Sequence, residues 1–156
     1  MDAVGLATLE SEMRQDARVM ADALHCALDR IEQPHPAGLE ACAHHLHRFY
    51  NAFEQMGLRL AKAFENHIDG DSGWHSSVLN RLALEIPGVR PAFLPEEARR
   101  PLHELRGFRH VFVHAYELTF QEPRIRALLA NAIAVDSSLE GLIRDFFAQV
   151  RRELGV

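Results

Sequence analysis

The chain has 156 residues and a formal net charge of −5, with 47% hydrophobic and 25% charged residues. These values predict one globular domain spanning residues 1–156, and they argue against a protein that coats nucleic acid through overall positive charge. Residues 1–12 lack the basic start and apolar centre of a secretory signal, and no apolar run approaches the roughly 20 residues of a membrane span, so we expect neither. Cys26 and Cys42 lie in separate helical patterns, and we expect unpaired thiols in a reducing cytoplasm.

Two long helices, separated by prolines, are predicted in the first half of the chain. Apolar residues recur every three or four positions over 4–32, which is the period of a helix with one buried face. Pro34 and Pro36 end this pattern, because proline breaks a helix and restricts the residue before it. The same period resumes over 37–68 and ends at a turn rich in glycine and aspartate, 69–73.

One short and two long helices are predicted in the second half. A short helix over 74–85 precedes a loop, 87–95, that contains three prolines. Helices follow over 95–117 and 123–153, the last with Ile133 on its apolar side. Since no segment alternates as a strand, the expected fold is all-α, an antiparallel up-down helical bundle of four main helices plus one short helix.

The helix predicted over 95–117 carries a local excess of positive charge. Between residues 99 and 114, only Glu104 opposes a group of basic side chains: Arg99, Arg100, His103, Arg106, Arg109, His110 and His114. An acidic chain therefore retains a local site for a phosphodiester. Gly107 costs this helix about 1 kcal/mol relative to alanine, and we expect it to let another helix approach closely.

Arg109, His114 and Tyr116 form an Arg-x4-His-x-Tyr pattern, with His110 directly after the arginine. Arginine is a permanent cation that can grip a phosphate in two places, and histidine exchanges protons near neutral pH. Held together, a guanidinium and an imidazole can cleave RNA without a metal. On an ideal helix, however, Arg109 and His114 lie about 140° apart around the axis. A working site then needs a bent helix end or a second copy of the helix, and we predict a homodimer with the site at its interface.

The stretch 105–117 resembles the signature of HEPN-domain proteins, specifically the HepT-like ribonuclease toxins. Two further stretches, 47–54 and 73–75, are similar to the second and third helices of that family, so the resemblance covers essentially the whole chain. It implies a metal-independent endoribonuclease that cleaves RNA, such as tRNA or mRNA, as a dimer.

The resemblance also implies roles for individual residues. Arg109 and His114 would be catalytic, with His114 as general base or acid and Arg109 stabilising negative charge on the phosphorus. His110 and Arg106 would support the reaction by contacting the phosphate, and Tyr116 would contact the substrate. In the family this tyrosine also accepts AMP groups from a minimal nucleotidyltransferase antitoxin, which is the expected partner. The bulky anionic adduct would block the site.

Clustered histidines raise the alternative of a metal site. His44 and His47 can share a helix face, with His45 between them, and His110 and His114 have the spacing of zinc-binding helices. However, the sequence lacks a His-Glu-x-x-His motif and the paired Glu-x-x-His motifs of di-iron bundles. We therefore expect no metal and no cofactor, and we expect the first three histidines to lie at the surface or at an interface.

Polar residues also lie along the helix predicted over 37–68. Arg48, Tyr50, Glu54 and Arg59 are expected to make structural contacts within the bundle or at the dimer interface, and Glu54 is a candidate partner for an arginine of the site. Trp74 is expected to anchor the core.

Two alternatives to a ribonuclease remain. The first is a non-catalytic HEPN-like module that binds nucleotide or a nucleotidyltransferase, with Tyr116 only as a modification acceptor, and the acidic net charge favours it. The second is a structural bundle in which Arg109 and His114 lie on an ordinary solvated helix face. Growth arrest upon expression distinguishes the ribonuclease from the binding module, and the structural bundle predicts that Arg109→Ala and Tyr116→Phe change nothing measurable.

Overall fold

The computed structural model describes residues 1–33, 36–65, 74–114 and 119–155, without the side chains of 74–76. The expected all-α bundle is confirmed, and among the described residues the only pairing of the strand type is an isolated bridge between Ile86 and Arg90. The helices are α1 (Ala3–Ile31), α2 (Pro36–Glu65), α3 (Trp74–Leu82), α4 (Glu96–His114) and α5 (Glu122–Leu154).

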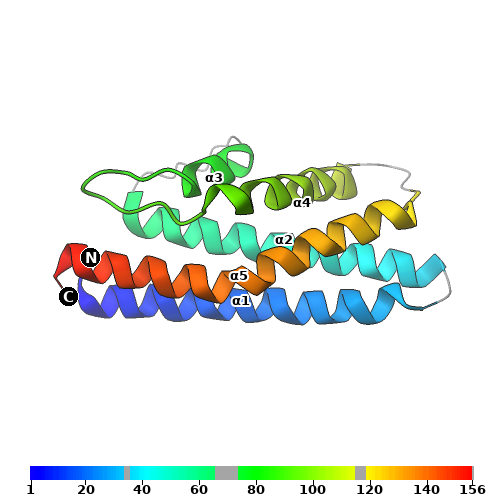
Figure 1. Cartoon of the computed structure of the whole chain (residues 1–156), viewed down its shortest axis with the longest axis horizontal. Helices are drawn as coiled ribbons and strands as arrows, with labels where there is room; N and C mark the ends of the chain where they lie inside the picture. The colour runs from blue at the N-terminus through cyan, green and yellow to red at the C-terminus, as the bar shows by residue number, and fades with distance from the viewer. Residues whose placement is uncertain (34–35, 66–73, 115–118, 156) are drawn as a thin grey trace.

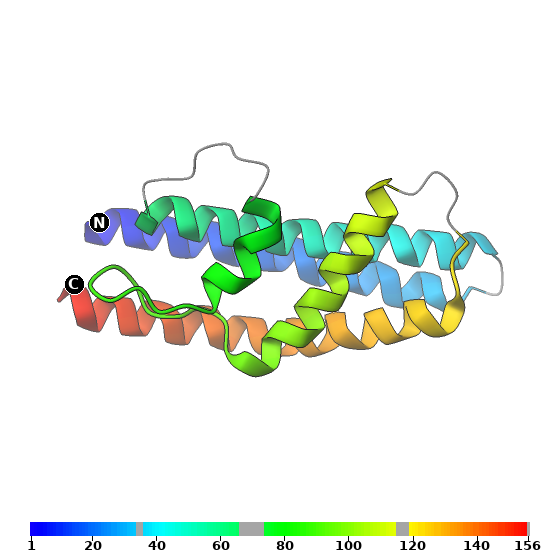
Figure 2. The same ribbon diagram turned by 90° about the horizontal axis from the view of Figure 1, so that it is seen from above.

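Three long helices, α1, α2 and α5, run along the length of the molecule, with α1 antiparallel to the other two (Figure 1). The α4 helix packs on α2 and α5 and crosses them obliquely (Figure 2). Both chain ends lie at the same end of the bundle. This arrangement places one face of α4 against α2 and leaves another face toward solvent.

The α2 helix supplies the centre of the core. Its buried apolar side chains recur every three or four residues, as an amphipathic helix requires: Leu46, Phe49, Phe53, Met56 and Leu60, all fully buried. Burying a side chain of this kind contributes about 1.5–3 kcal/mol. A glycine on the same helix, Gly57, lies so close to α3 that an added Cβ would come within 2.9 Å of Val78 and Leu82.

The four long helices begin within one residue of the predicted positions. The short α3 begins at the predicted residue but ends at Leu82, three residues earlier than expected. The reason is long-range hydrogen bonding, because the Leu82 carbonyl accepts the N–H groups of Phe93 (2.8 Å) and Leu94 (3.0 Å). The predicted turn at 69–73 and the predicted ends of the second and fourth helices lie outside the described residues.

The loop between α3 and α4 is held down by one buried arginine. Arg90 donates to Glu65 Oε1 at the end of α2 through Nη2 (2.6 Å) and Nε (3.0 Å). It also donates to the carbonyls of Leu84 (2.9 Å), Arg81 (2.9 Å) and Pro91 (3.2 Å). Its side chain is 0% exposed, and all three of its nitrogens are therefore used.

Two expectations for individual residues were wrong. Ile133 is 45% exposed, because the packed face of α5 is defined by the buried residues Ala132 and Val135 and Ile133 is rotated away from both. Gly107 does not admit a neighbouring helix, since an added Cβ would meet nothing within 4 Å. Within the described part of the chain, no helix has the length and apolar character needed to cross a membrane.

Candidate functional site

Arg109 lies on the face of α4 that packs against α2. Its Nη2 is 3.4 Å from Oε2 of Glu54, and its Nε donates to Oδ1 of Asn51 at 3.3 Å. The Glu54 side chain is 4% exposed and the Arg109 side chain 23% exposed. The pairing expected between Glu54 and an arginine of the site is thus present. The guanidinium is held by two long contacts but still reaches the surface.

A chain of polar contacts continues from Arg109 along α2. Because Asn51 Oδ1 accepts from Arg109, its amide nitrogen points the other way and donates to Nε2 of His47 at 3.2 Å. The His47 ring stacks on Phe112 of α4, with ring centroids 4.8 Å apart and planes at 22°. Burial, and then the nearby positive charges of Arg109 and His44, lower the pKa of His47. Neutral His47 therefore fits its place as an acceptor.

Tyr50 lies near Glu54 and Arg109, on the buried side of α2. Its side chain is fully buried, and among the described residues its hydroxyl has no hydrogen-bond partner. Burial first, and then the negative charge of Glu54, raise the pKa of Tyr50 far above its ordinary value. The hydroxyl stays protonated, so it adds no charge beside Glu54 and Arg109.

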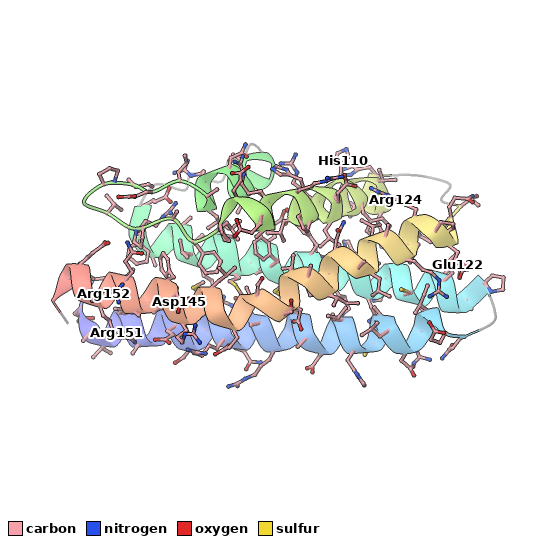
Figure 3. All side chains as sticks on the ribbon, in the orientation of Figure 1. His110, Glu122, Arg124, Asp145, Arg151 and Arg152 are labelled. Atoms are coloured by element: carbon pink, nitrogen blue, oxygen red, sulfur yellow. The ribbon has the colours of Figure 1, made fainter. Side chains whose placement is uncertain are left out.

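His110 and His114 occupy a different, exposed face of α4. Their ring centroids are 4.4 Å apart and the ring planes meet at 31°, as expected for residues four apart on a helix. Figure 3 shows His110 on the outer side of α4. Nδ1 of His114 lies 2.8 Å from the His110 carbonyl oxygen. Because a carbonyl oxygen only accepts, Nδ1 carries the proton in this contact, and in that tautomer Nε2 is left as the acceptor of an exposed ring.

The structure does not bring Arg109 and His114 together within one chain. Arg109 faces α2, whereas His114 is exposed and bonded to its own helix, as the angle of about 140° predicted. Arg106 is half-buried one turn before Arg109, and its charge, after burial, lowers the pKa of His103. Tyr116 lies outside the described residues.

A comparison with protein-family models matches residues 41–150 to the HepT-like proteins. The chain belongs to the HepT-like family. The match contains α4, the polar residues of α2 and most of α5, and membership supports a HEPN-type toxin module. Comparisons with curated proteins and with solved structures find no match.

The cysteines and the other described histidines of this HepT-like chain have ordinary surroundings. Among the described residues, no group of three or more histidine, cysteine, aspartate or glutamate side chains is arranged to hold a metal ion. His44 is exposed and His45 half-buried, and their rings meet edge to face at 5.5 Å. Cys26 and Cys42 are unpaired thiols, and burial raises the pKa of Cys42 to about 11. The side chain of Trp74 lies outside the described residues.

Two residues of the site were not singled out from the sequence. Asn51 precedes Glu54 by three positions on the same helix, so their shared face was a usable signal once Glu54 was suspected. Phe112 gave no such signal, because an aromatic residue at helical spacing is ordinarily part of a core. Of the other polar residues of α2, Arg59 pairs with Asp16 at 2.8 Å and Arg48 contacts His45 at 3.3 Å.

Proposed function

We propose that this HepT-like chain is a cytoplasmic, metal-independent endoribonuclease toxin that cleaves RNA such as tRNA or mRNA. The observation that carries the proposal is the state of the two motif residues in a HepT-like protein. Arg109 is held by a buried carboxylate yet reaches the surface, and His114 is exposed, with its Nδ1 on the His110 carbonyl and Nε2 left as the acceptor. These are the states expected of an anion-binding cation and of a general base.

In the proposed reaction, the 2′-hydroxyl of a ribose attacks the adjacent phosphorus. His114 Nε2 takes the proton of that hydroxyl, and the bond from phosphorus to the 5′-oxygen of the next nucleotide breaks as that oxygen takes a proton from water. The products are a 2′,3′-cyclic phosphate and a 5′-hydroxyl. Arg109 stabilises the negative charge that develops on the phosphorane oxygens, while His110 and Arg106 orient the phosphate.

The separation of Arg109 from His114 supports a site shared by two chains. In one chain the guanidinium is directed to α2 and the imidazole to solvent, so a single α4 helix does not present both to one phosphate. Two copies of α4 related by a two-fold axis would present two Arg-His sets around one cleft. We therefore propose that the active form is a homodimer.

Regulation would act through Tyr116, two residues beyond His114. We propose that a minimal nucleotidyltransferase antitoxin transfers AMP to its hydroxyl. The added phosphate would neutralise nearby cations, and the added nucleoside would fill the space that RNA requires. Mass spectrometry of protein co-expressed with the antitoxin should find the mass of AMP on the peptide that contains Tyr116, and not on the Tyr116→Phe variant.

The decisive experiment is RNA cleavage by purified protein in EDTA, with total tRNA and a generic single-stranded RNA as substrates. Wild type should cleave, and His114→Ala should not, because the proton acceptor is gone. His25→Ala is the matched control, since His25 is an exposed histidine on α1 outside the proposed site. Circular dichroism should show equal helical content for all three. Undiminished cleavage by His114→Ala would refute the proposal.

The second candidate is a non-catalytic module that binds nucleotide or a nucleotidyltransferase. The division of Arg109 and His114 between two faces of one helix favours it, as does the net charge of −5. Growth arrest upon expression of wild type, relieved by His114→Ala, supports the toxin. If unmodified protein neither cleaves RNA nor arrests growth, the result supports the binding module.

A further inference from the structure

A groove of about 200 Å³ lies between α4 and the start of α5. Its walls are largely apolar: Gly107, Phe108 and Val111 from α4, with Phe120 and Ile125 from the other side. The rings of Phe108 and Phe120 lie 6.4 Å apart with their planes at 52°, so they pack against each other and form an aromatic part of the groove wall. A flat, apolar ligand has faces on which such rings can stack.

Gly107 keeps this groove open. An added Cβ would meet nothing within 4 Å, and the residue is exposed although it lies within a helix that would be more stable with alanine there. Val111, one turn further on, is 50% exposed. The helix therefore gives up stability at a position where a side chain would occupy the groove.

The edge of the groove is polar. Thr119, Gln121 and Arg124 line it with a hydroxyl, an amide and a guanidinium. Arg124 pairs with Glu104 at 2.7 Å, but both side chains are well exposed, at 54% and 40%, so the pair is screened and exchangeable. This combination of apolar walls and several donors and acceptors at one edge matches the two faces and the hydrogen-bonding edge of a nucleobase.

The groove adjoins the face of α4 that carries His110 and His114. Gly107, Val111 and His114 follow one another at spacings of four and three residues, so they line one side of the helix. Along the axis, Val111 is only about 4.5 Å from His114. His110 and Arg124 lie at the same end of the bundle (Figure 3). A phosphodiester held at His114 and a base in the groove would therefore belong to the same or adjacent nucleotides.

We propose that this groove binds one nucleobase of the RNA beside the cleaved phosphodiester. The base stacks against the phenylalanine rings, and its edge meets Gln121 and Arg124. The charge of the surroundings fits, because the Arg124 guanidinium attracts the phosphates on either side of that base. The proposal rests on the proposed function for its ligand, but its test does not require cleavage.

The test fills the groove at its glycine. Gly107→Leu places a side chain in the groove from a Cβ that meets nothing within 4 Å, and it should not unfold α4, since leucine favours helix. Gly141→Leu is the matched control, because a Cβ there meets only the flexible Arg144 side chain at 3.9 Å, on α5 outside the groove. Binding is measured by fluorescence anisotropy with a short 2′-fluoro RNA, which lacks the attacking hydroxyl. A series of oligomers, each abasic at one position, locates the bound base.

Wild type should bind one abasic oligomer about 10- to 100-fold more weakly than the intact one, the range expected for a stacked base. Gly107→Leu should bind both equally weakly, and Gly141→Leu should behave as wild type. With cleavable RNA, Gly107→Leu should raise KM by a similar factor and change kcat less. Its thermal midpoint should equal or exceed that of wild type.

Other results overturn the proposal without touching the ribonuclease. If wild type cleaves RNA and Gly107→Leu cleaves with the same KM, the groove is not a base site although the function stands. If Gly107→Leu changes the sedimentation coefficient but not the effect of any abasic position, a second copy of the chain occupies the groove. Base-dependent binding without cleavage by any variant supports the groove and refutes the ribonuclease.

Discussion

Two buried carboxylates on α2, Glu65 and Glu54, each pair with an arginine from later in the chain, but the two pairs differ in how completely the arginine is used. Glu65 receives Arg90 at 2.6 Å, and the Arg90 side chain is 0% exposed. Glu54 receives Arg109 at 3.4 Å, and the Arg109 side chain is 23% exposed. One arginine is enclosed by protein acceptors, whereas the other is held at a distance and left with a path to solvent.

The Glu65–Arg90 pair connects the end of α2 to the loop between α3 and α4. Three backbone carbonyls around the loop accept from Arg90, and Arg81 adds a second cation beside Glu65. Burial raises the pKa of Glu65, but the hydrogen bonds from Arg81 and Arg90 outweigh it and hold the pKa below its usual value. A carboxylate in this state stays ionised and ties the end of α2 to the loop that leads into α4.

The Glu54 pair orients its arginine less completely. Two long contacts, to Glu54 and Asn51, orient the guanidinium without saturating its donors. A cation held in this way can exchange part of its contact for a phosphate, which a cation enclosed like Arg90 cannot. The two carboxylates are similarly buried, so it is the exposure of the partner arginine, 0% for Arg90 and 23% for Arg109, that distinguishes the two pairs.

The largest effect should come from Arg90→Met. This variant leaves three carbonyls without their donor and removes one of the two cations beside the buried Glu65 carboxylate, so we expect the free energy of unfolding to fall by about 3–5 kcal/mol. Urea denaturation measures it. Arg144→Met, which loses only an exposed pair with the adjacent Asp145, should match wild type. A change in Arg90→Met no larger than that of the control would show that the Glu65–Arg90 pair is not structural.

Arg109→Lys should give the next largest effect, on catalysis and not on stability. Lysine keeps a positive charge near Glu54 but lacks the planar fork that grips two phosphate oxygens, so cleavage should fall about 100-fold. The free energy of unfolding should change by less than about 1 kcal/mol. Initial rates of RNA cleavage and urea denaturation of the same preparation distinguish the two. Equal cleavage by wild type and variant would mean that Arg109 is a second structural arginine.

A smaller effect is expected for Glu54→Gln, which keeps the shape of the side chain but removes its charge. Arg109 would lose the stronger of its two anchors, and kcat should fall about tenfold, as expected for a group that positions another. In the Arg109→Lys background the same substitution should cost little more, because the two act as one unit. Fully additive losses in the double variant would show that Glu54 acts independently of Arg109.

The helices of this bundle were predictable because their signal is local. The apolar period over 123–153 and the prolines at 34 and 36 placed the helices within one residue at their starts. The end of α3 was not predictable in this way, since it depends on hydrogen bonds from residues 93 and 94 to the Leu82 carbonyl. The burial of Arg90 was not predictable either. Arginine is almost never fully buried unless it is paired, and no local sequence pattern identifies Glu65 as its partner.

In the candidate site, too, the local features were predictable and the long-range contacts were not. Helix geometry alone predicted that Arg109 and His114 would point apart and that His110 and His114 would lie together. The contacts of Arg109 with Asn51, and of Phe112 with His47, depend on where α4 crosses α2. That crossing is set by packing between segments about 60 residues apart in sequence. A local periodicity of apolar residues carries no information about such packing.

The smallest effect should be a pH dependence of the free energy of unfolding that comes from His47, which contacts Arg109 through Asn51. The folded-state pKa of His47 is lowered, so between that pKa and the unfolded value near 6.5 the unfolded chain binds more protons. Stability from neutral His47 is therefore present above about pH 6.5 and lost as the pH falls through the folded pKa. Protonation would turn the acceptor of Asn51 into a donor, at a cost on the order of 0.5 kcal/mol, the low end for one hydrogen bond.

His47→Gln measures this contribution, because glutamine can accept from Asn51 but does not titrate. Urea denaturation of wild type and variant at pH 7.5 and 5.5 should show a larger loss of stability for wild type. His45 and His103 also have lowered pKa values, but they titrate in both proteins and cancel in the difference. The same protonation adds a positive charge near Arg109 and removes the acceptor that orients Asn51, so it should loosen the Glu54 pair while leaving the Glu65 pair unchanged. Equal pH dependence in the two proteins would show that His47 does not couple to the site, and that Asn51 is oriented by Arg109 alone.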